Sequence, residues 1–182
     1  MEVNKLWIPD NSNLWIIGKV IDNKVDEYIV ENNDDQIIVK KKNVKHVNNI
    51  SNYDEVSNLI NLVHLHEPAI LNVISKRYYN NLIYTFTGPI LLVVNPFKKL
   101  NIYSNKLIFD YHNDTHNSIK EPHIYKICKA AYNNLIKYDK NQSILISGES
   151  GAGKTVSAKI IMNYLSKISL KSDAGNRSAK WV

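Results

Sequence analysis

Residues 148–155 have the types and spacing of a phosphate-binding loop. They match the pattern G-x-x-x-x-G-K-[ST], in which glycines let the backbone wrap an anion so that successive N–H groups point inward. In such a loop Lys154, the candidate catalytic residue, bridges the β- and γ-phosphates, and the Thr155 hydroxyl ligates Mg²⁺. We therefore expect a nucleoside triphosphate to bind here together with Mg²⁺. The candidate binding residues are Gly148, Glu149, Ser150, Gly151, Ala152, Gly153, Lys154 and Thr155.

The segments that flank this loop predict the elements that position it. Residues 144–147 form a short apolar run that is typical of a buried strand. After the loop, apolar residues recur at helical spacing, and the start of that helix adds its positive dipole end to the loop. These residues are Val156, Ile160, Ile161, Tyr164, Leu165 and Ile168. Further on, residues 171–176 are predicted to form a loop.

The first fifty residues predict a small β-module. The predicted strands cover residues 14–21, 28–30 and 37–39. Residues 32–35 have the composition of a hairpin turn between the last two strands. We expect the strands to pack around Trp7, Trp15 and Val39. A structural role is favoured over ligand binding for this module.

Two helices are predicted after the β-module. Apolar residues at helical spacing indicate the first over residues 56–63. In the second helix Pro68 lies in the first turn, where a backbone N–H would lack a helical partner anyway. The expected buried face of this helix consists of Ile70, Leu71 and Ile74.

Two strands and a further helix are predicted between these helices and the phosphate loop. Residues 82–87 alternate between apolar and polar, whereas residues 90–94 are continuously apolar, as in a strand covered on both faces. Glu121 and Pro122 open the predicted helix. Cys128 lies on its apolar stripe, which indicates a buried structural thiol and not a nucleophile.

Four of these segments, in this order, resemble the motor domain of myosins. The resemblance includes the phosphate loop, the helix before it, and the strands that lead into a purine-binding segment. The matching segments are Leu65–Leu71, Ile83–Lys99, Pro122–Tyr125 and Asn141–Thr155. Together they cover roughly residues 55–168, and residues 1–50 resemble the small SH3-like barrel of that family.

The resemblance implies a fold, an activity and partners. The implied fold is a small all-β SH3-like barrel over residues 1–50, followed by an incomplete α/β P-loop NTPase domain of the myosin/kinesin-like motor type over residues 51–182. The implied activity couples hydrolysis of ATP to ADP and phosphate with movement on actin filaments, in the cytoplasm and in association with the cytoskeleton. Light chains or calmodulin-like proteins are further implied partners. An N-P-x-x-x-x-x-x-Y segment implies an adenine site, here at Asn95, Pro96 and Tyr103.

Because of two departures from the family pattern, we do not expect this chain alone to be catalytically competent. Myosins usually have an acidic residue directly after the loop threonine, whereas this chain has Val156. The stretch after Thr155 also lacks the two switch segments that the family uses for hydrolysis, and residues 173–182 match no motif. We therefore expect the front part of a motor domain. The alternative is a nucleotide-binding fragment without turnover. A third possibility, a small P-loop kinase, needs an Arg-rich lid. This chain has only two arginines, Arg77 and Arg177, which argues against a kinase.

The amino-acid composition excludes several classes of protein. The chain is 44% hydrophobic and 22% charged and has a single cysteine, which excludes a disulfide scaffold and wholesale disorder. The net charge of +6 comes almost entirely from lysine, so nucleic-acid binding is not expected. No apolar run is long enough for a membrane helix, and no metal site is expected at His112 and His116, which lie in a segment interpreted as a loop. A soluble intracellular protein is expected.

Overall fold

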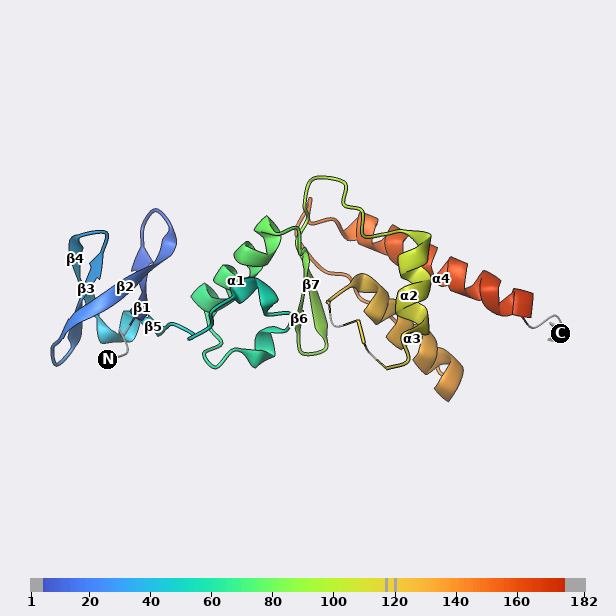
Figure 1. Cartoon of the computed structure of the whole chain (residues 1–182), viewed down its shortest axis with the longest axis horizontal. Coiled ribbons are helices and arrows are strands. Elements are labelled where there is room, and N and C mark those ends of the chain that lie inside the picture. The colour runs from blue at the N-terminus through green and yellow to red at the C-terminus, as the bar shows by residue number, and fades with distance from the viewer. Residues whose placement is uncertain (1–4, 117, 120, 176–182) are drawn as a thin grey trace. The chain divides into compact units, whose positions relative to one another are not determined.

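The computed structural model describes residues 5–116, 118–119 and 121–175, the last five of them by their backbone alone (Figure 1). The chain divides into two compact units, residues 1–76 and residues 77–182. Among the described residues, no helix has the length and apolar character that crossing a membrane requires. The predicted domain boundary after residue 50 lies inside the first unit and stays a prediction.

The first unit contains a five-stranded antiparallel sheet. Its strands are β1 (Lys5–Asp10), β2 (Leu14–Asn23), β3 (Glu27–Asn32), β4 (Asp35–Lys40) and β5 (Lys45–His46), in the order β4-β3-β2-β1-β5. The three strands predicted from the sequence are therefore confirmed. So is the hairpin turn, in which Asn33 and Asp34 adopt positive φ angles of 49° and 69°. Asn and Asp tolerate this conformation, and it matches the twist of a two-residue hairpin.

The core of this sheet differs from the predicted one. Leu6 and Ile8 of β1 pack with Val30 and Val39. Trp7 is buried, but strand alternation turns its side chain to the opposite face of β1 from Leu6 and Ile8. The other predicted core tryptophan is only half-buried. Closure of this sheet into an SH3-like barrel stays a prediction.

The predicted helix over residues 56–63 is wrong. The structure has only a short 3-10 turn there, Leu59–Asn61, and its N-cap Asn58 accepts a hydrogen bond from the Ile60 N–H at 3.3 Å. Leu59 and Leu62 are buried, three residues apart, which fits a 3-10 turn as well as the first turn of an α-helix. Apolar spacing over so short a window could not separate the two.

Helix α1 (Glu67–Tyr79) has Pro68 in its first turn, as predicted. Its buried face, however, consists of Ala69, Val73 and Arg77 and not of the larger apolar residues between them. These three residues follow i, i+4, i+8 spacing, so one of the positions that the sequence pattern treats as polar is a buried arginine. The last turn of α1, from Arg77, belongs to the second unit.

The second unit consists of a β-hairpin and helices. Strands β6 (Tyr84–Thr87) and β7 (Ile90–Val93) pair antiparallel and confirm the two predicted strands. The helices after them are α2 (Asn105–Asn113), α3 (Ile124–Tyr138) and α4 (Lys154–Gly175). Strand β7 is not covered on both faces as predicted, since Ile90 is 60% exposed.

Four local predictions in this unit need correction. His112, interpreted as part of a loop, lies in α2, which Ser104 caps by accepting a hydrogen bond from the Leu107 N–H. Helix α3 begins at Ile124, after the cap residue His123, and not at Glu121. Residues 144–147 form no strand, and Leu145 is 92% exposed; nothing in the described part of the chain pairs with this segment. Residues 171–175, predicted as a loop, continue α4.

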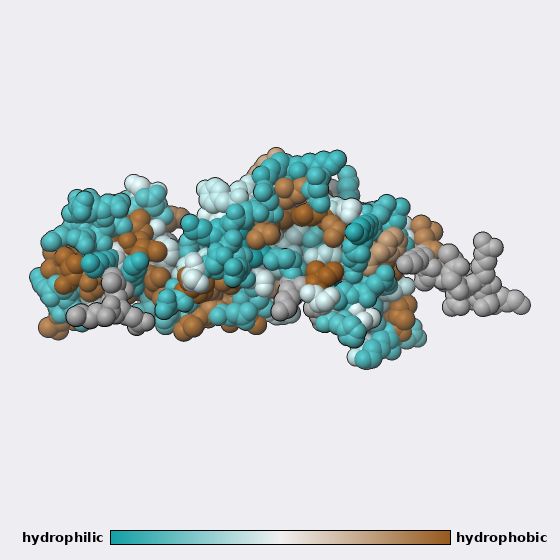
Figure 2. Space-filling model, in the orientation of Figure 1, coloured by the Kyte–Doolittle hydropathy of each residue, from teal (hydrophilic) through white to brown (hydrophobic). Residues whose placement is uncertain are grey.

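The core of the second unit lies between α2, α3 and α4. Cys128 is fully buried there, as predicted, and burial raises the pKa of its thiol to about 12. The buried side chains are Ile83, Tyr84, Ile108, Tyr111, Ile124, Tyr125, Cys128, Ile161, Tyr164 and Ile168. The predicted apolar stripe of α4 is confirmed except at Val156, which is 61% exposed. Apolar patches interrupt the mostly hydrophilic face in Figure 2.

Candidate functional site

The predicted phosphate loop is a bent, exposed segment that runs directly into α4. Gly151 and Gly153 have φ angles of +80° and +92°, a region that residues with a Cβ atom rarely adopt. The Ala152 N–H donates to the Glu149 carbonyl at 3.2 Å, which closes a turn inside the loop. The two glycines thus give the loop a curvature that few other residues would tolerate.

The side chain of Lys154 folds back over this curved loop. Its Nζ donates to the carbonyl oxygens of Gly148 at 2.8 Å and Glu149 at 2.9 Å. Thr155 follows it in the first turn of α4 and is exposed. The first N–H groups of a helix have no intrahelical acceptor and carry its positive dipole end. An ammonium, a hydroxyl and unpaired N–H groups therefore converge at one exposed helix start, which is an arrangement suited to an anion.

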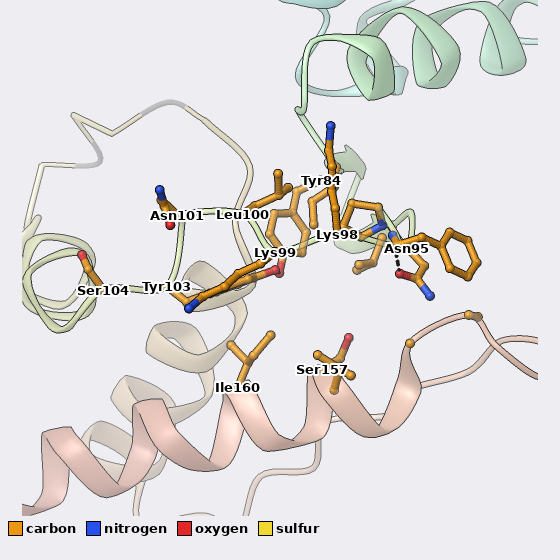
Figure 3. Close-up of a pocket in the computed structure, with 17 residues that line it drawn as sticks. Tyr84, Asn95, Lys98, Lys99, Leu100, Asn101, Tyr103, Ser104, Ser157 and Ile160 are labelled. Atoms are coloured by element: carbon orange, nitrogen blue, oxygen red, sulfur yellow. Dashed lines mark hydrogen bonds between the residues drawn. The ribbon is translucent and has the colours of Figure 1, made fainter.

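A cavity of about 750 Å³ adjoins this helix start. Figure 3 shows it between α4, which carries Ser157 and Ile160, and the segment that carries Asn95 to Ser104. The walls include the predicted purine-segment residues Asn95, Pro96 and Tyr103, together with Ala152 and Gly153 of the loop. The remaining lining residues are Ile83, Tyr84, Val93, Phe97, Lys98, Lys99, Leu100, Asn101, Ser104, Val156, Ser157 and Ile160.

The structure thus brings the two predicted sites together. Five of the predicted residues line one cavity, whereas Gly148, Glu149, Ser150 and Gly151 lie in the loop outside its walls. Lys154 and Thr155 are at the start of α4, next to the lining residues Gly153 and Val156. Among the described residues that line the cavity, the charged ones are lysines, so the cavity carries positive charge.

Asn95 connects the purine segment to the phosphate loop. Its Nδ2 donates to the Gly151 carbonyl at 2.8 Å, and its Oδ1 accepts from the Phe97 N–H at 3.0 Å. A Cβ atom on Gly153 would stand 3.9 Å from the Asn95 side chain, in ordinary contact. One amide therefore fixes both the turn after β7 and the curved part of the loop.

Tyr103 is the aromatic wall of the cavity. It is half-buried, and its hydroxyl shares a hydrogen bond of 2.7 Å with the Tyr84 hydroxyl. Burial raises the pKa of both phenols, so both rings are neutral at physiological pH. Two uncharged, mutually bonded tyrosines present a flat, mainly apolar surface to the cavity.

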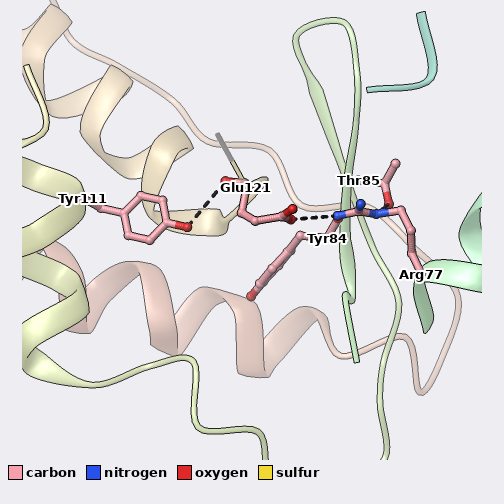
Figure 4. Close-up of polar contacts among 5 residues, drawn as sticks. All are labelled: Arg77, Tyr84, Thr85, Tyr111 and Glu121. Carbon is pink, nitrogen blue, oxygen red and sulfur yellow. Dashed lines mark hydrogen bonds and ion pairs between the residues drawn. The ribbon is translucent and has the colours of Figure 1, made fainter. Parts of the chain in front are cut away.

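The sequence pattern does not predict the ion pair between Arg77 and Glu121. The Arg77 guanidinium, 1% exposed, contacts the Glu121 carboxylate at 3.0 Å (Figure 4). Arg77 also donates to Thr85 Oγ1 at 3.1 Å and to the Tyr84 carbonyl at 3.0 Å, while the Tyr111 hydroxyl donates to the Glu121 carbonyl at 3.4 Å. The chain has few arginines, and one placed inside an otherwise apolar helix pattern was the only available signal.

The sequence predicts no metal site at His112 and His116. His112 lies in α2, not in a loop, and its Nδ1 is 3.2 Å from the Tyr164 hydroxyl. Within the ranges that the structure describes, no three His, Cys, Asp or Glu side chains gather closely enough to hold a metal ion.

Comparisons with known proteins find one matching family and several similar relatives. The family model described as "Myosin head (motor domain)" matches residues 56–180. The Myosin-H heavy chain of Dictyostelium discoideum is 36% identical over 175 residues, covering 96% of this chain and 10% of the relative. Myosin-1 of Saccharomyces cerevisiae is 36% identical over 90% of this chain and 10% of the relative, and Myosin-1 of Arabidopsis thaliana is 37% identical over 89% and 14%. The chain thus spans about a tenth to a seventh of the length of these curated relatives.

Proposed function

Because this chain belongs to the myosin motor-domain family, we propose that it binds ATP with Mg²⁺, the phosphates in residues 148–155 and the adenine in the adjoining cavity. The observation that carries this proposal is the Asn95 amide, which joins the Gly151 carbonyl to a cavity lined by Pro96 and Tyr103. A nucleotide needs an anion site and a flat apolar slot side by side, and these residues supply both.

The phosphate end of the site works by electrostatics. The curved backbone around Gly151 and Gly153 and the first N–H groups of α4 donate hydrogen bonds to phosphate oxygens. Lys154 places a positive charge between the β- and γ-phosphates, and the loop carbonyls that hold its Nζ keep the ammonium within the loop. Thr155 would hold Mg²⁺ through its hydroxyl, and the bound ion would neutralise phosphate charge.

The base end of the site works by shape. Pro96 and Tyr103 line the cavity together with Val156 and Ile160 of α4, which supply apolar surface. A cavity of about 750 Å³ lies within the usual size of small-molecule sites. The acidic residue that myosins usually carry after the loop threonine is Val156 here, so this wall of the site is apolar and uncharged.

The activity of the whole protein is a further part of the proposal. We infer an actin-based motor that couples ATP hydrolysis to movement along filaments, associated with the cytoskeleton and with light chains or calmodulin-like proteins as further partners. Residues 1–50 form its SH3-like barrel, and residues 51–182 are the first part of its P-loop domain. The alternative is a module that binds nucleotide without turnover. Release of phosphate from ATP by the 182-residue chain, absent from a Lys154→Ala variant, would decide against that alternative.

The binding site is tested by titrating the chain with Mg·ATP in a calorimeter. Lys154→Ala removes a charge-assisted contact to the phosphates and should weaken binding by about 100-fold. Lys159→Ala is the matched control: Lys159 is an exposed lysine on the same helix, outside the cavity walls, and its loss should change affinity less than about threefold. Undiminished affinity of the Lys154→Ala variant, or equal losses in both variants, would overturn the site.

A further inference from the structure

The imidazole of His123 connects the start of α3 to the segment that carries Tyr103. Its Nδ1 is 3.2 Å from the Tyr125 N–H, and its Nε2 is 3.0 Å from the Ile102 carbonyl oxygen. A backbone N–H can only donate, so Nδ1 must be the acceptor. The proton of the neutral ring is therefore on Nε2, which donates to Ile102. His123 therefore caps α3 through Nδ1 and donates a hydrogen bond through Nε2 to the segment that carries Tyr103.

The ring of His123 is held from all sides by aromatic contacts. It is 5% exposed, and it stacks on Tyr111 at a centroid distance of 4.9 Å and an angle of 27°. The rings of Tyr84 and Tyr125 lie 4.9 Å and 4.3 Å away, and that of Tyr103 5.7 Å away. Burial lowers the pKa of His123 to about 4, so the ring stays neutral and keeps this hydrogen-bonding pattern.

The segment before His123 is also fixed. Glu121 is held by the buried Arg77 guanidinium through its carboxylate and by the Tyr111 hydroxyl through its carbonyl (Figure 4). Only Pro122, whose φ angle is restricted by its ring, separates this anchor from His123. The imidazole therefore starts from a constrained backbone position.

The carbonyl that His123 holds belongs to the peptide bond that joins Ile102 to Tyr103. Because this peptide is planar, fixing the direction of its carbonyl also fixes the direction in which the Tyr103 Cα leaves it. The far end of Tyr103 is fixed by the hydrogen bond with Tyr84. The aromatic wall of the cavity is thus held at its backbone by His123 and at its hydroxyl by Tyr84.

We propose that His123 is a positioning residue for the nucleotide base: through the Ile102 carbonyl it sets the place of Tyr103 and so the affinity of the cavity for adenine. This inference rests on the proposed ATP site. His123 is not itself among the residues that line the cavity, but its ring contacts the lining residues Tyr84 and Tyr103, so it acts on the base and leaves phosphate binding unchanged.

Two substitutions separate the two nitrogens of His123. In His123→Asn, the side-chain oxygen replaces Nδ1 and continues to cap α3, but nothing reaches Ile102. In His123→Gln, the longer amide N–H₂ replaces Nε2 and continues to donate to Ile102, but the cap is lost. The Gln variant is therefore the matched control, because it keeps the hydrogen bond to the Ile102 carbonyl and loses the cap of α3.

Affinities of both variants are measured for Mg·ATP and for Mg·tripolyphosphate, a probe that has the phosphates and no base. His123→Asn should weaken Mg·ATP about tenfold, the worth of one buried hydrogen bond, and change Mg·tripolyphosphate less than about twofold. His123→Gln should stay within about threefold of the unmodified chain for both. Equal losses for the two probes in the Asn variant, or an equally large ATP loss in the Gln variant, would overturn the proposal.

A measurement on the unmodified chain tests the same proposal without relying on the folding of a variant. The proton NMR signal of the His123 Nε2–H should shift when Mg·ATP binds and stay in place with Mg·tripolyphosphate. A signal that does not respond to bound ATP would overturn the positioning role while leaving the nucleotide site intact. Failure of the unmodified chain to bind either probe would instead overturn the proposed function, and the positioning role with it.

Discussion

Lowering the pH from 7 to 5 should destabilise the second unit through His123. In the folded chain its pKa is about 4, against an ordinary value of 6.5, because burial penalises the imidazolium. Its Nδ1 accepts from the Tyr125 N–H, so a protonated ring would also turn a donor toward a donor. A depressed pKa of this kind gives stability that is complete above pH 6.5 and is lost as the pH falls toward 4.

The size of the effect follows from the difference between the two pKa values. Each unit corresponds to about 1.4 kcal/mol, so the gap between 6.5 and about 4 corresponds to about 3 kcal/mol when the pH is below both. At pH 5 about 2 kcal/mol of this is already lost. For a unit of this size such a loss is a large fraction of the total free energy of unfolding.

The assay is urea unfolding followed by ellipticity at 222 nm, which reports the helices, at pH 7, 6 and 5. The difference between the unmodified chain and His123→Asn isolates this one histidine from all the others. Asp114→Asn is the control: the pKa of Asp114 is lowered to about 2 by hydrogen bonds from Ile119 and Ser118, so its contribution changes only below its ordinary value of 3.8. If His123→Asn lost stability between pH 7 and 5 as steeply as the unmodified chain, the reasoning would be refuted.

Three other expectations concern packing and reactivity. Arg77→Met should lower the free energy of unfolding by about 3 kcal/mol, because it leaves several buried acceptors without their donor. Glu121→Gln should lower it by only about 1 kcal/mol, because Glu121 is 56% exposed. Urea unfolding of both variants measures the contrast, and equal losses would contradict it. Gly18→Ala should destabilise the first unit by about 1–3 kcal/mol, since its Cβ would lie 2.9 Å from the Val30 Cβ, and a tryptophan-fluorescence unfolding curve unchanged from that of the unmodified chain would contradict this. The Cys128 thiol, with a pKa raised to about 12 by burial, should react with an aromatic disulfide reagent only after urea unfolds the chain; rapid reaction of the native chain would show that the thiol is accessible.

The elements that local chemistry defines were predictable from the sequence. The hairpin at Asn33 and Asp34 needs residues that accept positive φ, and the curvature of the phosphate loop needs its glycines. Both features depend on residue types that lie within a few positions of one another in the sequence. The apolar stripe of α4 is long enough for its period to be clear.

Features that depend on distant partners were not predictable. Apolar spacing could not reveal that α1 buries Arg77, because the burial depends on Glu121, which is 44 residues away. The exposed segment at Leu145 has the residues of a buried strand, but a strand also needs a neighbour to pair with. The two hydrogen bonds of His123 join residues that only the fold brings together, at Ile102 and Tyr125.

The two hydrogen bonds of the Asn95 amide have a consequence for the proposed nucleotide site. Since the same side chain bonds to Gly151 in the loop and to Phe97 in the cavity wall, ordering either partner reduces the freedom of the other. At the proposed nucleotide site we therefore expect adenosine and tripolyphosphate, added as separate molecules, to bind cooperatively, each raising the affinity of the other by the same factor. In that proposal the binding of the base and the binding of the phosphates are thermodynamically coupled through the Asn95 side chain.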